Sequence, residues 1–398
     1  MKSDILRLTC VFFDRKEKRM LKKIAVTGGP CAGKSDFRKF IAAELEKSGL
    51  KPLFTPEVAT IHLESGIKLE DAISTADKVF KFEGEVLRMQ LFFEAHWTRV
   101  AEELGYDVIF FDRGISDINT YMDDPAYAEL LKTEGLIAQD IHTRYDGVLY
   151  LVSAADGVPE HYSCANNPSR YEKTIELALE TEIKTRHAWL GQPRLAVIRN
   201  VYNGKKITFE EKMARATEAV VDILAAPMRN FERKFLVGID VDPRNFPEEI
   251  KKSLTRISPQ TYLKSKDGAV RRIRDSWFDG APRPIHLYTE KRRLPNGVAE
   301  IHERPISEDE DRNLLTEADL EAFPVVKLRW SFFWQGQYFH FDWITRPQFV
   351  NILEVHPSRP DDLIEFPPFI GEVVEVTGRA DFTNEVIARG KCPCYQNK

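Results

Sequence analysis

The sequence predicts two domains of different fold class: an α/β domain with a doubly wound parallel sheet, then an all-β-rich domain with an antiparallel sheet or barrel. In the first half, continuous apolar runs alternate with long helical patterns, which is typical of strands buried on both faces. After Met228 the pattern changes to short strands with period-two alternation, separated by proline and glycine. We therefore expect an N-terminal extension at 1–21, the α/β domain at 22–227, the antiparallel domain at 228–390 and a tail at 391–398.

The elements of the first half follow from runs of β-branched and aromatic residues and from the helical patterns between them. The helix near Pro168 begins with asparagines and a proline, which are typical of a helix N-terminus. The expected strands are Ile24–Thr27, Leu53–Thr55, Val108–Phe111, Val148–Val152 and Leu195–Ile198, and the expected helices are Lys34–Glu46, 76–104, Pro168–Trp189 and Phe209–Ala225.

A phosphate-binding loop follows the first strand and precedes the first helix. Residues 28–35 match the pattern G-x-x-x-x-G-K-[ST], in the strand–loop–helix context in which that pattern is specific. Backbone N–H groups of such a loop surround a polyphosphate, the lysine contacts its outer phosphates, and the hydroxyl contacts Mg²⁺. The expected nucleotide-binding residues are Gly28, Gly29, Pro30, Cys31, Ala32, Gly33, Lys34 and Ser35.

Charged residues follow the other strands of the same sheet. Asp112 and Arg113 end the Val108–Phe111 strand, and Glu57 follows the second strand. Carboxyl ends of parallel strands are where such sheets bind ligands, so we expect Asp112 to hold Mg²⁺ or orient an acceptor hydroxyl, and Arg113 to offset phosphoryl charge. Glu57 is a second candidate carboxylate. We expect Lys34, Asp112, Arg113 and Glu57 to be the catalytic residues. The alternatives are that Asp112 caps the helix that begins near Ser116 and that Glu57 is an exposed residue in a turn.

Further cations, Arg170, Lys184 and Arg186, lie on the long helix between the fourth and fifth strands. Small P-loop kinases carry a phosphate-clamping lid at this place, and we add Arg170 to the expected nucleotide-binding residues. The alternative is that helical cations form solvated ion pairs.

The residues at Val26–Ser35, Pro56-Glu57-Val58-Ala59 and Phe111-Asp112-Arg113-Gly114, with Asp117, resemble the NadR-kinase and Ttd-type P-loop domain, a relative of small nucleoside kinases. The resemblance covers about residues 22–225. It implies phosphotransfer from ATP or GTP, or GTP binding without an established reaction, and it does not choose the base.

In the second half, charged residues alternate within the expected strands, so that each pair points to one face. If that face points inward, the domain has a cation-lined interior suited to a polyphosphate and a divalent metal. If it points outward, these charges are solvated, and Phe231, Phe235, Ile273, Leu328 and Val355 form the core. The expected elements are strands at Phe231–Val237, Ala269–Arg274, Ile285–Lys291, Val325–Phe333, Gln337–Thr345 and Phe349–Val355, with a helix at Ser307–Leu320.

An ordered set of these segments resembles the CYTH domain of the triphosphate tunnel metalloenzymes. The segments include 230–237, 260–263, 272–274, 327–329, 353–356, 372–377 and 382–388. The resemblance implies an eight-stranded antiparallel tunnel barrel that binds triphosphate-containing ligands and often hydrolyses them with Mg²⁺ or Mn²⁺. It assigns phosphate binding to Lys234, Arg272, Arg274, Lys291, Lys327 and Arg329, and metal binding to Glu232, Asp342, Glu354 and Glu375. In the first domain, the expected metal ligands are Ser35, from the loop pattern, and Asp112, from the strand end.

This sequence departs from the CYTH pattern at the metal ligands. Asn230 and His356 replace two carboxylates, and only Glu303 of a third motif is in register. Mg²⁺ prefers oxygen ligands, so we expect a weakened metal site while the phosphate-binding cations remain. Binding of an anionic ligand should therefore survive better than hydrolysis.

Composition excludes several other classes. The net charge of −5 argues against a nucleic-acid partner, and no 18-residue apolar run suggests a membrane span. Five scattered cysteines are typical of a cytoplasmic protein with reduced thiols. We expect an enzyme that transfers or hydrolyses the phosphoryl group of ATP or GTP, joined to a tunnel that binds a triphosphate or another phosphorylated compound. The alternatives are a nucleotide-dependent switch that binds a phosphorylated partner or phospholipid headgroup without turnover, and a triphosphatase acting in the tunnel.

Overall fold

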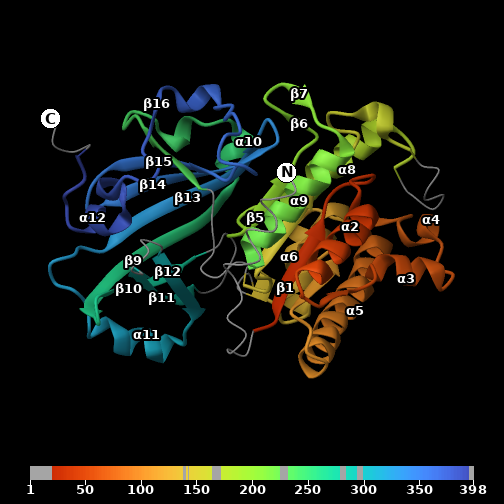
Figure 1. Ribbon diagram of the computed structural model, residues 1–398, viewed down its shortest axis with the longest axis horizontal. Coiled ribbons are helices and arrows are strands. Elements are labelled where there is room, and N and C mark those ends of the chain that lie inside the picture. Colours follow the sequence, from red (N-terminus) through yellow and green to blue (C-terminus); the bar gives the residue numbers. More distant parts are fainter. Residues whose placement is uncertain are drawn as a thin grey trace. The chain divides into compact units, whose positions relative to one another are not determined.

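The computed structural model describes residues 20–137, 140–141, 143–163, 172–224, 232–277, 284–293 and 299–393. The chain divides into two compact units, Met1–Ala225 and Ala226–Lys398, which are described separately below (Figure 1). The expected boundary at 227/228 falls among residues 225–231, outside the described residues. Most of the N-terminal extension, Arg170, Asn230 and the last five residues lie outside them as well.

The first unit contains the predicted parallel sheet. Its five strands have the order β2-β3-β1-β4-β5, and every neighbouring pair is parallel. Strand β1 is central, so the loop that follows it lies at the middle of the sheet's carboxyl edge. The strands are β1 (Lys22–Thr27), β2 (Pro52–Phe54), β3 (Val108–Asp112), β4 (Gly147–Leu151) and β5 (Leu195–Ile198), all within two residues of the predicted bounds.

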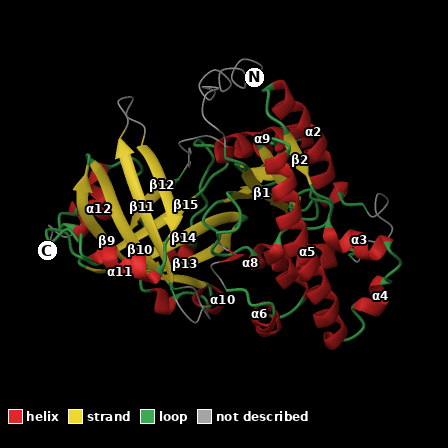
Figure 2. Ribbon diagram, turned by 90° about the horizontal axis from the view of Figure 1, so that it is seen from below, coloured by secondary structure: helices red, strands yellow, loops and turns green. Residues whose placement is uncertain are grey.

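Helices pack on both faces of this sheet, which makes it doubly wound (Figure 2). Apolar residues of α2 and α9 share one core with alternate residues of β1, β3 and β4. Helix α5 and the 3₁₀ helix η1 contribute to another core, with α3 and α6. The helices are α2 (Lys34–Lys47), α3 (Val58–Glu64), α4 (Leu69–Ala72), α5 (Ala76–Glu103), η1 (Ile115–Tyr121), α6 (Asp124–Thr133), η2 (Pro159–His161), α8 (Ile175–Ala188) and α9 (Phe209–Leu224), and a small hairpin joins β6 (Val201–Tyr202) to β7 (Lys205–Lys206).

Helix α8 begins later than the sequence suggested. The expected helix started at Pro168, but α8 starts at Ile175, where the Thr174 side chain caps it by accepting a hydrogen bond from the Leu177 N–H. The threonine satisfies a backbone donor that has no partner inside the helix, which explains a start at this residue.

The second unit contains one large antiparallel sheet (Figure 2). Its nine strands have the order β12-β11-β10-β9-β13-β14-β15-β8-β16. The expected barrel had eight strands, and among the described residues the strand pairings leave β12 and β16 as outer edges. The elements are β8 (Arg233–Val237), η3 (Pro243–Asn245), α10 (Glu248–Lys251), β9 (Leu254–Lys266), β10 (Ala269–Ser276), β11 (Ile285–Arg293), β12 (Ala299–Pro305), α11 (Glu308–Leu315), β13 (Val325–Trp334), β14 (Gln337–Arg346), β15 (Val350–Val355), η4 (Pro368–Ile370), β16 (Val373–Glu375), η5 (Ala380–Phe382) and α12 (Asn384–Ala388).

The two faces of this sheet differ in chemistry. One face is aromatic: Phe235, Trp330, Phe339 and Phe341 pack with residues of η4 and the segment before α10. The opposite face carries the alternating charges, and its apolar end is covered by α12. We call this second face the charged face; by strand register it includes Lys234, Arg272, Arg274, Lys291, Lys327 and Arg329.

The described part of the chain contains no helix with the length and apolar character that crossing a membrane requires.

Candidate functional site

The phosphate-binding loop runs from the end of β1 at Thr27 to the start of α2 at Lys34. Two of its glycines are sterically required. Gly28 has a φ of 140°, and a Cβ there would lie 1.9 Å from the Leu151 carbonyl oxygen. A Cβ on Gly29 would lie 2.2 Å from a Glu182 carboxylate oxygen. The loop therefore fits closely against β4 and α8, and only residues without a side chain allow that approach.

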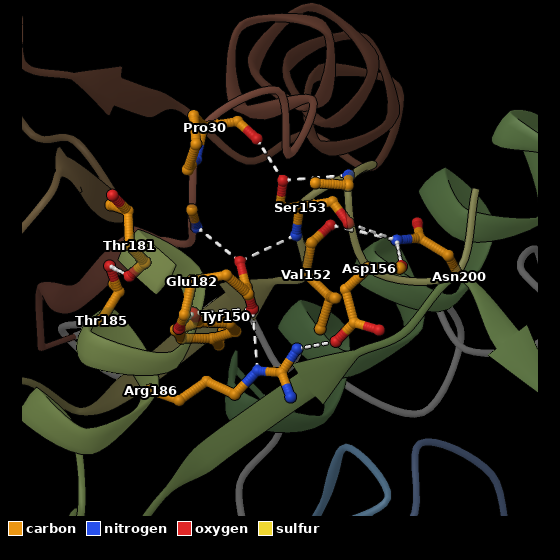
Figure 3. Close-up of polar contacts among 12 residues, drawn as sticks. Pro30, Tyr150, Val152, Ser153, Asp156, Thr181, Glu182, Thr185, Arg186 and Asn200 are labelled. Atoms are coloured by element: carbon orange, nitrogen blue, oxygen red, sulfur yellow. Dashed lines mark hydrogen bonds and ion pairs between the residues drawn. The ribbon is translucent and has the colours of Figure 1, made fainter. Parts of the chain in front are cut away.

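Glu182 of α8 supports this loop through hydrogen bonds (Figure 3). The carboxylate is fully buried, and its Oε2 accepts hydrogen bonds from the N–H groups of Gly29 (3.0 Å) and Ser153 (2.9 Å). Its Oε1 accepts from the Tyr150 hydroxyl (2.9 Å) and from Arg186 Nε (2.8 Å). One buried carboxylate thus joins the loop to β4 and to its own helix through four donors.

Other side chains hold the far side of the loop. Lys212 of α9 is buried and donates to the carbonyl oxygens of Ala32 (3.0 Å) and Val152 (2.6 Å), and burial lowers its pKa to about 8. The Ser153 hydroxyl donates to the Pro30 carbonyl, and Asn200 Nδ2 donates to the Ser153 carbonyl at 2.7 Å. These contacts fix the loop's backbone.

The carboxyl end of β3 brings together three residues that the sequence analysis singled out. Arg113 adopts a left-handed backbone conformation with a φ of 68°, which is unfavourable for a residue with a side chain. Its guanidinium is held by Glu57 (Nε to Oε1, 2.5 Å) and by Asp117 (3.2 Å). Asp117 also accepts hydrogen bonds from the Thr27 hydroxyl and the Gly114 N–H. This network links β1, β3 and the segment after β2, and the backbone strain marks the place as a candidate site.

The charges at this edge act on one another. Burial acts to raise the pKa of Glu57, but the charges of Arg113 and Lys34 outweigh it and hold that pKa at about 2. For Asp112, burial dominates over the Lys34 charge and raises the pKa. Lys34 is therefore close enough to act on both carboxylates. The Asp112 Oδ1 atom is buried and has no hydrogen-bond partner among the described residues.

A further carboxyl group near Arg113 was not found by sequence reasoning. Glu83 of α5 is buried, and burial raises its pKa to about 8 against the opposing charge of Arg113. Tyr121 at the end of η1 also interacts electrostatically with Arg113, Glu57 and Glu83. Sequence gives no signal for Glu83, which looks like an ordinary charge in a long helix.

The two described lid candidates differ from each other. Lys184 is exposed and pairs with Glu180 one turn earlier, as expected for a solvated helical pair. Arg186 is instead largely buried between Glu182 and Asp156 (Figure 3). Arg186 therefore helps to hold Glu182, the residue that supports the loop.

In the second unit, the cations of β8 and β13 are paired with carboxylates. Asp342 accepts from Lys327 (2.6 Å) and from Arg329 (Nε, 2.5 Å), and Glu354 is paired with Arg329 and with Lys234 (2.9 Å). Burial lowers the pKa of Lys327 to about 8, and the nearby Arg329 adds to this. Three of the expected phosphate-binding cations are thus paired with two of the expected metal ligands.

The neighbouring part of the charged face, on β10 and β11, is different. Arg272 donates to Gln260 at 3.2 Å and Arg274 to Glu303 at 3.2 Å. The Nε atoms of both arginines are buried and have no hydrogen-bond partner within the described residues. Burial also lowers the pKa of Arg274. Lys291 lies on the same face in register with Val270. This part of the face therefore retains two guanidinium N–H groups that no acceptor among the described residues satisfies.

The remaining expected metal ligands do not form one cluster. Glu375 is opposite Phe235, so it lies on the other face from Lys234, where it forms a bidentate pair with Arg233 (2.7 and 2.9 Å). The expectation that it joins the metal ligands of the charged face is therefore wrong. Burial, with the charge of Glu354, raises the pKa of Glu232 to about 7, and burial lowers the pKa of His356 to about 4.

Comparison with known proteins found a family model that matches part of the first unit. Residues 23–200 match a family model described as an AAA domain. The matched range contains the loop at 28–35 and spans the five-stranded parallel sheet, which is the context in which that loop pattern is specific. Comparison with the curated proteins found no match.

Several solved structures are similar to parts of the chain. An inorganic triphosphatase is 23% identical, with coverage of 42% of this chain and 97% of its own and a TM-score of 0.29. A deoxyadenosine kinase from M. mycoides is 16% identical, with coverage of 48% and 95% and a TM-score of 0.32. A putative adenylate cyclase from Bacillus halodurans is 15% identical, with coverage of 33% and 81% and a TM-score of 0.23. At these scores the similarities carry no argument about activity.

Proposed function

We propose that the first unit is a phosphotransferase that uses ATP or GTP, with the phosphate-binding loop as its nucleotide site. The observation that carries the proposal is the convergence of Lys34, Asp112 and Glu57 at one edge of the sheet. There the lysine charge acts on both carboxylates, and Arg113 is held in a strained conformation beside them.

The roles follow from the chemistry of each group. The loop N–H groups and Lys34 bind the nucleotide phosphates. Ser35 and Asp112 would hold Mg²⁺ or Mn²⁺, and the buried, unpartnered Oδ1 of Asp112 fits a hard cation. When bound, the metal neutralises phosphate charge. The chain's own contribution is to position the phosphates in a rigid loop, because Glu182 fixes Gly29 from beneath.

In this proposal, Glu57 and Arg113 act on the acceptor and on the transferred phosphoryl group. With a pKa of about 2, Glu57 is ionised at neutral pH and can accept a hydrogen bond from an acceptor hydroxyl. Arg113 remains charged and can offset charge on the phosphoryl group during transfer. A hydroxyl-bearing acceptor gives phosphotransfer at this site, and water gives NTP hydrolysis.

We propose as a second function that the charged face of the second unit, arranged as a tunnel, binds a phosphorylated ligand such as a triphosphate or a phospholipid headgroup. The unpartnered Nε atoms of Arg272 and Arg274 favour binding. The carboxylates that would hold a divalent metal, Asp342 and Glu354, are instead occupied by cations, and Glu232 titrates near neutral pH. Binding without hydrolysis is therefore favoured here, which also suits the alternative of a nucleotide-dependent switch.

The phosphotransferase proposal is tested with γ-labelled ATP and GTP, supplied with a panel of nucleosides as hydroxyl acceptors. Label should reach an acceptor or free phosphate with the wild-type protein, and both products should be lost in Asp112→Asn. Asp107→Asn, immediately before the start of the same strand, is the matched control. Transfer that continues in Asp112→Asn at the rate of the control would refute the proposed site.

A further inference from the structure

A cluster of three potential metal ligands lies on the second unit's sheet, away from the charged face. Asp275 of β10 and His286 of β11 are directly opposite each other in the strand register. Asp275 is one residue from Arg274, so its side chain points to the other face. Helix α11 packs on that face through Leu314, near Ile273, and supplies Asp311. The three side chains therefore come from two strands and the helix that covers them.

Their donor atoms are close to the spacing that one ion requires. His286 Nδ1 lies 2.8 Å from Asp275 Oδ1 and 3.8 Å from Asp311 Oδ2, and one ligand atom of each residue lies within 4.8 Å of the others. Ligands that bind one ion at about 2.0–2.2 Å lie roughly 3–3.5 Å apart. A small adjustment of the Asp311 side chain would bring the three atoms to that spacing.

Asp311 is the feature that sets this cluster apart from a surface group of acids. It is only 5% exposed, and its Oδ1 is buried without a hydrogen-bond partner in the described part of the chain. The other acids of the same helical turn, such as Glu308 and Asp309, are exposed and paired with Arg312. A buried carboxylate oxygen with no donor is costly, and a cation would relieve that cost.

We propose that Asp275, His286 and Asp311 bind a divalent transition-metal ion that fastens helix α11 to the β10–β11 hairpin. One imidazole and two carboxylates suit Zn²⁺ or a neighbouring transition metal better than Mg²⁺, which prefers oxygen ligands alone. The ion would bridge elements that are otherwise joined by a small apolar cluster around Ile273 and Leu314. This site is independent of the phosphate sites proposed above.

The test is a calorimetric titration of the full chain with Zn²⁺ in excess Mg²⁺, which occupies sites made of oxygen ligands alone. The variants are His286→Gln, Asp311→Asn and Asp275→Asn, with Asp309→Asn as the matched control on the exposed side of α11. Because Asp275 is partly exposed and the change to asparagine keeps its shape, that variant should fold even if Asp311→Asn does not. Circular dichroism verifies the fold of each.

Wild type and Asp309→Asn should bind one Zn²⁺ at this site, and each folded ligand variant should weaken that binding by at least about tenfold, the low end of the loss seen when groups supporting a metal are removed. Absence of Zn²⁺ binding by the wild type, or equal affinity in Asp275→Asn, His286→Gln and the control, would overturn the proposal.

Discussion

At the scale of single residues, Glu182 is the side chain on which the shape of the phosphate-binding loop depends most. Glu182→Ala leaves the Gly29 and Ser153 N–H groups without an acceptor, so we expect weaker nucleotide binding and a loss of about 1–3 kcal/mol in the free energy of unfolding. Calorimetric titration with Mg-ATP and urea denaturation measure the two effects. Glu180→Ala, on the exposed side of the same helix, is the control. Nucleotide affinity equal to that of the control would mean that the hydrogen bonds of Glu182 are not needed for nucleotide binding.

The raised pKa of Glu83 leads to a prediction about how the free energy of unfolding depends on pH. Its pKa is about 8 in the folded protein against an ordinary value of 4.5, so the unfolded chain loses this proton at lower pH than the folded chain does. Its stabilising contribution is present below about pH 4.5 and is lost as the pH rises toward 8, by on the order of 1 kcal/mol per pH unit.

Glu83→Gln removes this titration. The free energy of unfolding, followed by urea denaturation from pH 5 to 8, should fall less steeply in the variant than in the wild type. Parallel curves for the two proteins would show that Glu83 is already ionised in the folded state.

Sequence reasoning found the residues of the loop and its rim but not the residues that support them. The loop pattern and the ends of strands are local signals, and they led to Lys34, Asp112 and Glu57. Glu182 and Arg186 are four residues apart on a helix and look like a solvated ion pair. Only the packing of α8 against β4 buries them, and no local pattern reports that packing.

At the scale of elements, strand β10 carries Arg272 and Arg274 on one face and Asp275 on the other, because side chains alternate along a strand. Arg272 and Arg274 lie on the charged face, so Arg272→Ala/Arg274→Ala should weaken binding of tripolyphosphate at least tenfold, because each lost charge-assisted contact costs about 1.5–3 kcal/mol. Arg292→Ala, next to Lys291 but exposed, is the control. Calorimetric titration with tripolyphosphate measures the difference, and equal affinities in the double variant and the control would remove the charged face as an anion site.

The period-two pattern predicted which residues share a face, but it could not say how that face is buried. Both readings of the pattern were partly right, since Phe235 and Val355 are core residues and the charges beside them are also buried. Other segments of the chain pack on both faces of this sheet, so residues on either face are buried. That outcome depends on segments far away in the sequence, such as α12 on one face and η4 on the other.

Strand register explains why the prediction for Glu375 was wrong. A shift of one residue moves a side chain to the other face, which is why Glu375 pairs with Arg233 and not with the cluster around Lys234. Strand β12 was recognised only through Glu303, and β9 was expected only around 260–263 although it spans Leu254–Lys266. Helix α11 begins at Glu308, one residue after the predicted start at Ser307, and ends at Leu315 instead of the predicted Leu320.

At the scale of the whole molecule, the chain combines two compact units, each with its own candidate phosphate site. We expect the two sites to respond independently to mutation, because substitutions without shared partners are usually additive. In a multiple-turnover phosphate-release assay, turnover of ATP or GTP should be lost in Lys34→Ala and kept in Arg272→Ala/Arg274→Ala. The reverse pattern would place the chemistry on the charged face, and tight binding without turnover in the wild type would favour the nucleotide-dependent switch.

The most direct test of the central claim, that a nucleotide binds in the loop at 28–35, is a calorimetric titration with Mg-ATP and Mg-GTP. It is best done in the Arg272→Ala/Arg274→Ala background, so that binding of the triphosphate to the charged face is weakened. Lys34→Ala is compared there with Lys39→Ala, an exposed lysine of the same helix. We predict one binding site that Lys39→Ala preserves and Lys34→Ala abolishes. Unchanged nucleotide affinity in Lys34→Ala would contradict the account.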